Sequence, residues 1–414
     1  MIAAYREVFR IGSFRSFWLG FTFSELGDAV TRVALTWYVY ETTRSARALG
    51  LLMLCYTGPV VVGGLLAGTL LDRYDRRQVM LVDSVVRGTA VALIPVLSVA
   101  GQLALWHVYA IAAVYGFLMM VSLAGGPALV PSLVGREHLS TANALETLSF
   151  TLGSVIGPVL AGLLIGVVGT VNVIWLDAIS YFAFAGALAR LRLAEPEPNG
   201  SGADGDAYRL PHAVRLLLVN RVLRSTTLMF MAFNVGGGFL AVWLPILTDR
   251  VLGGGAGLYG TLLGLQAVGG VASALLAGGR AFAVPLGTLI CGAQLLSGAS
   301  VAVMLIGPGV WTVVAGLVGL GAFSAPLTIW AQTLRMQIIP ERLRGRTFAL
   351  LRMLMQSGNP LGGAIAGGLL PILGLPAMIA LSALVIGAPG IAGYRVKELH
   401  SGNTRQEKLV EAER

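Results

Sequence analysis

The sequence predicts an all-α membrane protein with twelve transmembrane helices in two six-helix halves. Three observations support this fold class: hydrophobic residues make up 56% of the chain, charged residues make up only 12%, and the apolar residues gather in helix-length blocks. A soluble domain carries about 25% charged residues. An apolar run of about 20 residues spans a bilayer as a helix, because lipid offers the backbone no hydrogen-bond partner outside the helix itself.

The apolar blocks follow one another with short gaps between them. Those of the first half are Phe17–Val39, Ala48–Leu71, Val79–Val99, Leu103–Leu123, Leu145–Val168 and Val171–Leu191. Those of the second half are Thr226–Leu247, Leu258–Ala277, Ala283–Leu305, Trp311–Leu334, Phe348–Leu370 and Pro376–Ala392. Twelve helices with their loops use most of the 414 residues, so little of the chain remains for a soluble domain.

A polar stretch rich in proline and glycine separates the two sets of blocks, beginning at Ala194. Such a composition is typical of a flexible linker. The predicted organisation is an N-terminal half at 1–193, a cytoplasmic linker at 194–224, a C-terminal half at 225–396 and a cytoplasmic tail at 397–414. Weak internal repeats favour two related halves, as in many secondary transporters.

The basic residues indicate how the chain is oriented in the membrane. Arg44, Arg47 and Arg250 fall in odd-numbered gaps, and Arg32 and Arg87 fall inside helices. The other lysines and arginines lie at the termini, in even-numbered gaps, or within a turn of them. Because positively charged loops stay in the cytoplasm, both termini should be cytoplasmic. The net charge of +9 therefore reflects topology, and no basic stripe with stacking aromatic residues indicates nucleic-acid binding.

The sequence offers no pattern for a metal, a cofactor or an enzyme site. Cys55 and Cys291 fall in helices of different halves and are predicted to be free thiols, and the four histidines lack metal-ligand spacing. Residues 255–260 match G-x-G-x-x-G, but they join two membrane helices instead of following a β-strand. No phosphate-binding P-loop sequence is present, so ATP-driven transport by this chain alone is not expected.

A charged motif occupies the first short cytoplasmic gap, and its residues are Gly68, Asp72, Arg73, Arg76 and Arg77. It resembles the signature of the major facilitator superfamily between helices 2 and 3, although Asp75 replaces the usual glycine. An acid at a helix C-terminus faces an unfavourable dipole, so Asp72 should pair with arginines or with the N-terminus of another helix. We predict a conformational latch here; the alternative is an anchor that only fixes the topology.

A second motif lies in the fifth apolar block and consists of Gly153, Gly157, Pro158 and Gly162. It resembles the helix 5 motif of the superfamily's drug:proton antiporters. Proline removes a backbone hydrogen bond and kinks a helix, while glycine allows close contact between helices. The resemblance to the antiporter motif implies export in preference to uptake.

Further matches extend the resemblance over nearly the whole chain. They are Gly27-Asp28, Asp83 with Arg87, Pro127, Pro131, Ala142-Asn143-Ala144 and Arg344-Gly345-Arg346. These residues are similar to those of the branch that contains bacterial macrolide-efflux and enterobactin-export proteins. The resemblance implies the twelve-helix major facilitator fold and proton-coupled export, and it leaves the substrate open.

Three ionisable residues in the first predicted helix are candidates for proton coupling or substrate binding. Glu25, Asp28 and Arg32 fall within an arc of about 60° on a helix of 3.6 residues per turn. Charges inside a bilayer are costly, so this face should point into a central cavity. We predict that Arg32 keeps Asp28 ionised and that Glu25 is the more easily protonated acid. Alternatively, Asp28 and Arg32 form a purely structural pair.

Other polar residues within the predicted helices are weaker candidates. Asp83 and Arg87 are spaced as a structural ion pair near the latch, and Asp177 is a second cavity acid. Amides and aromatic residues that could line a cavity, or instead make interhelical hydrogen bonds and packing contacts, are Asn234, Gln266, Gln294, Gln332, Gln356, Asn359, Phe230, Phe233 and Trp243.

Together these features predict a monomeric secondary transporter of the bacterial inner membrane. It would export an amphipathic or lipophilic small molecule, such as a drug or siderophore-like compound, in exchange for protons by alternating access. Its partners would be the substrate, protons and membrane lipids. One alternative is a lipid or lysophospholipid flippase of the same fold, and another is a receptor or scaffold that transports nothing.

Overall fold

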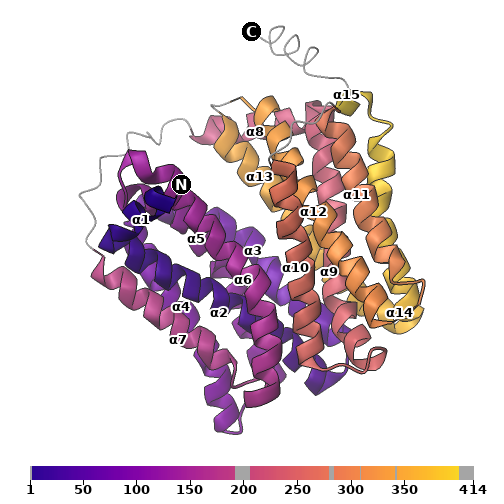
Figure 1. The fold of residues 1–414 in the computed structure, drawn as a ribbon, viewed down its shortest axis with the longest axis horizontal. Coiled ribbons are helices and arrows are strands. Elements are labelled where there is room, and N and C mark those ends of the chain that lie inside the picture. The colour runs from indigo at the N-terminus through magenta and orange to yellow at the C-terminus, as the bar shows by residue number, and fades with distance from the viewer. Residues whose placement is uncertain (1, 192–205, 279–283, 308, 341–342, 401–414) are drawn as a thin grey trace. The chain divides into compact units, whose positions relative to one another are not determined.

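The structure is a computed structural model that describes residues 2–191, 206–278, 284–307, 309–340 and 343–400. These residues form the helices drawn in Figure 1, in the order α1 (Ile2–Arg10), α2 (Gly12–Thr43), α3 (Ala46–Arg73), α4 (Arg76–Val99), α5 (Leu105–Leu129), α6 (Leu139–Val168), α7 (Ile174–Arg190), α8 (Asp206–Val219), α9 (Arg221–Arg250), α10 (Ala256–Gly278), α11 (Leu286–Val303), α12 (Val310–Ile338), α13 (Arg344–Gln356), α14 (Gly358–Gly393) and α15 (Lys397–His400). Two 3₁₀ turns, Val130–Ser132 and Arg136–His138, connect α5 to α6. Within the described residues, the secondary structure is therefore helical.

Nine helical segments of the described chain are long and apolar enough to cross a membrane. They lie in α3, α4, α5, α6, α9, α10, α11, α12 and the stretch Thr347–Gly393. Two helices that match predicted blocks are missing from this set. The first, α2, carries Glu25, Asp28 and Arg32, and the second, α7, has only 17 residues.

The last of the nine segments contains a break. Thr347–Gly393 is 47 residues long, which as one straight helix would measure about 70 Å against an apolar bilayer core of about 30 Å. Within α14, Gly374 has φ 78° and ψ 170°. This backbone region is essentially confined to glycine, so Gly374 separates two helical segments.

Polar side chains start several helices where the sequence leaves the apolar blocks. The hydroxyl of Ser45 accepts a hydrogen bond from the backbone N–H of Ala48 at the start of α3. The side chain of Asn220 accepts from the backbone N–H groups of Val222 and Leu223 at the start of α9. Each cap satisfies a backbone donor that has no partner inside the helix.

The predicted linker and tail are only partly covered. Residues 192–205 and 401–414 lie outside the described residues. The remainder of the predicted linker is helical, because it contains α8 and the start of α9. In the same way, the first residues of the predicted tail form the single turn α15.

The chain divides into two compact units. The first comprises Met1–Gly200 and Leu244–Gly264, and the second comprises Ser201–Trp243 and Leu265–Arg414. In the first unit, α2 packs against α6 and α7, α3 packs against α5, and α4 packs against α5 and α7. In the second unit, α11 packs against α12 and α14, and α8 packs against α13.

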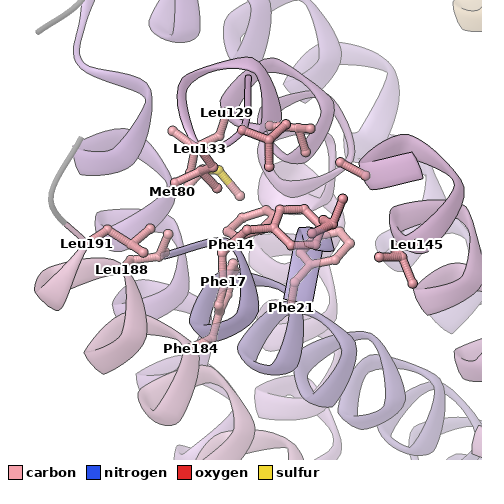
Figure 2. Packing of buried hydrophobic residues seen from close by; sticks show 14 residues of the cluster. Phe14, Phe17, Phe21, Met80, Leu129, Leu133, Leu145, Phe184, Leu188 and Leu191 are labelled. Atoms are coloured by element: carbon pink, nitrogen blue, oxygen red, sulfur yellow. The ribbon is translucent and has the colours of Figure 1, made fainter. Parts of the chain in front are cut away.

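One buried apolar cluster of the first unit is rich in aromatic residues. Phe14, Phe17 and Phe21 repeat at helical spacing along α2 and are buried together with Phe184 of α7 (Figure 2). The rings of Phe17 and Phe21 stack at 5.6 Å between centroids. Because these residues join α2 to α7, they fix the part of α2 that precedes its three charged residues.

Candidate functional site

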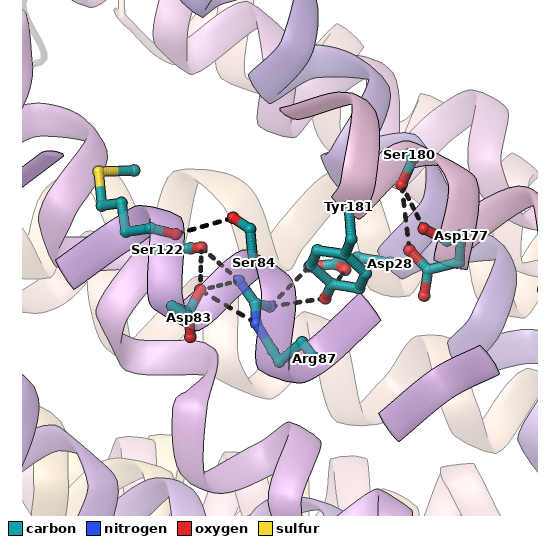
Figure 3. A network of polar contacts seen from close by, with 9 residues as sticks. Asp28, Asp83, Ser84, Arg87, Ser122, Asp177, Ser180 and Tyr181 are labelled. Carbon is teal, nitrogen blue, oxygen red and sulfur yellow. Dashed lines mark hydrogen bonds and ion pairs between the residues drawn. The ribbon is translucent and has the colours of Figure 1, made fainter. Parts of the chain in front are cut away.

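The central polar feature of the first unit is a buried network around Arg87 of α4 (Figure 3). Its Nη2 atom lies 2.6 Å from Oδ2 of Asp83, one turn away on the same helix. Its Nη1 atom lies 3.5 Å from Oδ2 of Asp28 on α2 and donates to the Tyr181 hydroxyl of α7 at 2.7 Å. Ser122 of α5 accepts from Nη2 and donates to Asp83, and Tyr181 donates to Asp28. One guanidinium thus ties together four helices.

The tyrosine rings around Arg87 complete its surroundings. Its guanidinium carbon lies 4.6 Å from the ring centroid of Tyr181 and 5.7 Å from that of Tyr115. A cation over an aromatic face is attracted by the ring quadrupole. With its side chain only 1% exposed, Arg87 depends on these rings and on the two carboxyls for stabilisation.

The network contains more acids than bases. Asp177 of α7 is fully buried, and Gly27 allows α2 to approach it so closely that a Cβ at this glycine would lie 3.0 Å from the Asp177 Cα. Oδ1 of Asp177 accepts from the Ser180 hydroxyl at 3.3 Å. Among the described residues, neither Oδ2 of Asp177 nor Oδ1 of Asp83 has a hydrogen-bond partner. Carboxyl oxygens in this state are suited to binding a proton.

This arrangement corrects the predicted pairing of Asp28 with Arg32. Asp28 is paired with Arg87 and Tyr181, whereas Arg32 interacts electrostatically first with Tyr56 and Tyr115 and more weakly with Asp28. Helical spacing places Asp28 and Arg32 on one face, but the packing of α4 and α7 against α2 brings in closer partners. Asp83 and Arg87 form the ion pair that their spacing predicts. Because Arg87 also contacts Asp28, this pair belongs to the buried network around Arg87.

Glu25 lies on α2 beside the network and is partly buried. It interacts electrostatically with Asp28, Arg87 and Arg32, and also with Glu146 of α6, which sequence reasoning missed. The sequence signal for Glu146 was weak, because this residue stands at the edge of a predicted block. No group of three or more His, Cys, Asp or Glu residues in the described part of the chain could hold a metal ion.

The helix 5 motif lies where α6 meets α2 and the start of α10. A Cβ at Gly153 would lie 3.0 Å from the carbonyl oxygen of Glu25, and one at Gly157 would overlap the Ala29 side chain. A Cβ at Gly162 would lie 3.0 Å from the Cα of Gly257. Gly153 and Gly157 therefore remove side-chain volume from the face of α6 that meets α2, as expected for a close helix–helix crossing, and Gly162 does so on the opposite side, which meets α10. Pro158 lies inside the same helix.

The loop motif caps helices of the first unit. Nη1 of Arg76 donates to the carbonyl of Ala128 at the end of α5, at 2.8 Å. Nη1 of Arg77 donates to the carbonyl of Leu191 at the end of α7, at 2.6 Å. Both arginines are thus placed where the helix dipole favours a cation. Asp72 lies in the last turn of α3, and its side chain is outside the described residues, so the predicted latch contact remains a prediction. Gly68 and Arg73 are exposed.

The chain matches a known protein family over almost its whole length. A family model described as transmembrane secretion effector, within the major facilitator superfamily, matches residues 5–411. The chain belongs to this family.

Relatives of this transporter include efflux and export proteins. The multidrug efflux pump Tap of Mycolicibacterium fortuitum is 26% identical over 391 residues, which cover 90% of this chain and 93% of Tap. The enterobactin exporter EntS of Salmonella choleraesuis is 27% identical over 362 residues, which cover 86% of this chain and 85% of EntS. The chain is therefore a multi-pass membrane transporter, not an enzyme, and its bacterial relatives suggest the inner membrane.

Solved structures support the same fold. The nucleoside transporter NupG matches with a TM-score of 0.79 at 10% identity and covers 92% of this chain and 99% of its own. A bacterial homologue of the human lysosomal transporter Spinster matches with a TM-score of 0.73 at 13% identity, covering 96% and 99%. At such low identity these structures bear on the fold alone.

The departure of this major facilitator protein from the family signature has a structural role. Asp75, which stands where the signature has glycine, is the N-cap of α4, and its Oδ1 accepts from the backbone N–H of Gln78 at 3.0 Å. The aspartate therefore starts the helix that carries Asp83 and Arg87.

Replacing Asp75 by alanine should lower the free energy of unfolding by about 1 kcal/mol, because the N-cap hydrogen bond is lost. Asp75→Ser, which keeps a capping oxygen, should be close to wild type. Thermal unfolding of the purified protein in detergent measures both. Equal loss in the two variants would show that the charge, and not the cap, matters at this position.

A second polar cluster of the transporter joins the last turns of α2 and α9 within the first unit. The hydroxyl of Tyr40 donates to Oδ2 of Asp249 at 2.6 Å, and Arg44 forms an ion pair with the same carboxylate. Nη2 of Arg250 donates to the carbonyl of Arg44 at 3.1 Å. Sequence reasoning placed the two arginines in odd-numbered gaps but offered no partner for them, because Asp249 is more than two hundred residues away from Tyr40.

Three of the candidate amide residues of the second unit, Asn234, Asn359 and Gln294, make interhelical hydrogen bonds. Nδ2 of Asn234 on α9 donates to the carbonyl of Met355 at 2.9 Å, and Nδ2 of Asn359 donates to Oδ1 of Asn234 at 3.3 Å. Gln294 is fully buried. The remaining amides are Gln266 and Gln356, which are partly buried, and Gln332, which is exposed.

The structure corrects the candidate cavity role of Trp243. This residue is fully buried within the second unit, and its Nε1 donates to the Ser382 hydroxyl at 2.9 Å. The indole N–H of Trp243 thus has a hydrogen-bond partner inside the packed helices and does not face a cavity. Arg335 of α12 was not singled out from the sequence, although it is 3% exposed, lies 4.7 Å from the Phe230 ring centroid and donates to the carbonyl of Thr226.

Proposed function

We propose that this transporter exports an amphipathic or lipophilic small molecule in exchange for protons, with alternating access. The observation that carries the proposal is the buried network in which Asp28 and Asp83 share the single guanidinium of Arg87. When one of these acids binds a proton, the net charge of the network changes and Arg87 is left to pair with the other acid, which can favour a different conformation.

Within this network Asp28 is the better candidate for the exchangeable proton. Arg87 is 2.6 Å from Asp83 but 3.5 Å from Asp28. Protonation of Asp28 therefore leaves Arg87 in its shorter ion pair, whereas protonation of Asp83 would leave a buried cation with the more distant acid. Glu25 lies beside Asp28 on α2 and is partly exposed, so it can pass protons or contact a cationic group of the substrate.

The proposed topology has twelve spans with both termini in the cytoplasm. It adds α2 and α7 to the nine apolar segments and counts the stretch divided at Gly374 as two spans. The charges of α2 are tolerated in a membrane because Asp28 faces partners on α4 and α7. Under this topology the loop motif lies at the cytoplasmic face, as the positive-inside rule requires.

The substrate class rests on the relatives. Tap is named as a multidrug pump and EntS as an enterobactin exporter, so a lipophilic cation and a catecholate siderophore are the two chemistries to test first. Gly153 and Gly157 line the face of α6 that contacts α2. We infer that these two helices move against each other during export, because contacts made by glycine can shift without displacing side chains.

The deciding experiment uses everted membrane vesicles and two probes, ethidium and enterobactin. Acidification of the vesicle lumen should drive accumulation of a transported probe, and an uncoupler should release it. Asp28→Asn should abolish accumulation while downhill probe exchange continues, because the substitution removes the titratable carboxyl but leaves the substrate-binding site in place. Accumulation that persists with an uncoupler and requires ATP, or that needs sodium alone, would contradict proton exchange.

A further inference from the structure

Glu146 is a buried acid that the network around Arg87 does not include. It lies on α6, is 5% exposed, and its Oε1 has no hydrogen-bond partner among the described residues. The carboxyl is packed against the backbone of Gly126 on α5, where a Cβ would lie 2.7 Å from Oε1, and the Phe21 ring borders the same glycine. An ionised carboxylate in such apolar surroundings is costly unless it binds a proton or gains a partner, so a buried glutamate of this kind is a candidate for a functional role.

The register between α2 and α6 places two hydroxyls between the levels of Glu146 and Glu25. Nε1 of Trp18 donates to the carbonyl of Leu145 at 2.7 Å, and the hydroxyls of Thr22 and Ser149 are 2.7 Å apart. Further along, Gly153 packs on Glu25 itself.

Glu146 and Gly153 are separated by two helical turns on one face of α6, a rise of about 10 Å. The buried hydroxyl pair of Ser149 and Thr22 lies between these two levels. Hydroxyls both donate and accept hydrogen bonds, so they are suited to connect two carboxyls.

The charged surroundings of Glu146 differ from those of Asp28. Within the described residues, no ion pair involves Glu146, and Glu25 of α2 is the charged group found to interact with it electrostatically. On the facing part of α5 it meets Gly126, and from α2 it meets the Phe21 ring. A purely structural role would be filled as well by glutamine, which has the same shape and no exchangeable charge.

We propose that Glu146 is a second proton-carrying carboxyl of the first unit, which exchanges protons with Glu25 on one side and with water at the Leu139 end of α6 on the other. This inference rests on the proposed function, in which that end is cytoplasmic. In the transfer step, the O–H bond of one carboxylic acid breaks as an O–H bond forms on the other carboxylate. The charge of the pair is unchanged, and no electron is transferred.

The direct test is infrared difference spectroscopy of the purified protein at two pH values, which detects the C=O stretch of protonated carboxyls. Glu146→Gln should remove one such band. The matched control is Glu137→Gln in the same unit, whose side chain is 72% exposed, and it should leave the band in place. An unchanged band in Glu146→Gln would overturn the proposal. Should this variant fail to fold, Glu146→Asp must shift the band, and an unshifted band is equally decisive.

Transport separates this inference from the proposed function. In everted vesicles with ethidium or enterobactin, Glu146→Gln should slow proton-driven accumulation by about a hundredfold, as for loss of a positioned proton-transfer group, while downhill exchange continues. Wild-type vesicles without any proton dependence would reject the proposed function itself. Proton-driven accumulation that is normal in both wild type and Glu146→Gln would reject only the role of Glu146.

Discussion

Replacement of Arg87 by glutamine is expected to destabilise the first unit severely and to abolish transport. The substitution leaves the carboxyls of Asp28 and Asp83 buried without their shared cation. Removing one partner of a buried ion pair costs about 3–5 kcal/mol, because the other charge stays desolvated. Thermal unfolding in detergent and ethidium or enterobactin accumulation in vesicles measure the two effects.

The control for this change is Arg44→Gln. Arg44 also pairs with an aspartate, but its side chain is 53% exposed, so solvent screens the pair and the loss of stability should be small. The double variant Asp83→Asn/Arg87→Gln should recover much of the stability, because it removes one charge of each sign. It should not recover proton-driven transport. An Arg87→Gln protein as stable and active as wild type would show that the network has no role.

Replacement of Gly157 by leucine should also abolish transport, for a steric reason. A Cβ at this position would overlap Ala29 of α2, so the larger side chain must push α2 and α6 apart. Overpacking of a close contact costs about 1–3 kcal/mol. Thermal unfolding and vesicle transport of a probe again provide the measurements.

Gly166→Leu is the matched control on the same helix. Gly166 is exposed, and a Cβ there would meet no atom within 4 Å. Since leucine forms helices better than glycine by about 1 kcal/mol, this variant should be as stable as wild type or more stable. If both leucine variants behaved alike, the crossing of α6 with α2 would not depend on the glycine face.

Much of the fold could be predicted from apolar block length. The predicted block Leu145–Val168 corresponds to α6, which begins earlier, at Leu139, because its first two turns are polar yet helical. A count of apolar residues cannot detect such turns. The charged first helix illustrates the opposite case, since α2 falls outside the nine apolar segments while the pattern of blocks still predicts it.

The site was predicted less completely, because contacts within one helix follow from spacing and contacts between helices do not. The spacing of Asp83 and Arg87 gives their ion pair directly. The partner of Asp28 depends on how α4 and α7 pack against α2, and this brings Arg87 and Tyr181 closer than Arg32. Glu146 was not predicted for the same reason, because its lack of a hydrogen-bond partner depends on how α2, α5 and α6 pack together.

The glycine-only backbone at Gly374 has a consequence for how the protein is made. From Pro360 to Gly393 the chain has no charged residue, and a ribosome-bound insertion channel would meet it without a charged loop to mark where one span ends. The non-helical backbone at Gly374 ends one helical segment and begins the next. We therefore expect the last two spans to enter the bilayer together as a hairpin whose turn is at Gly374.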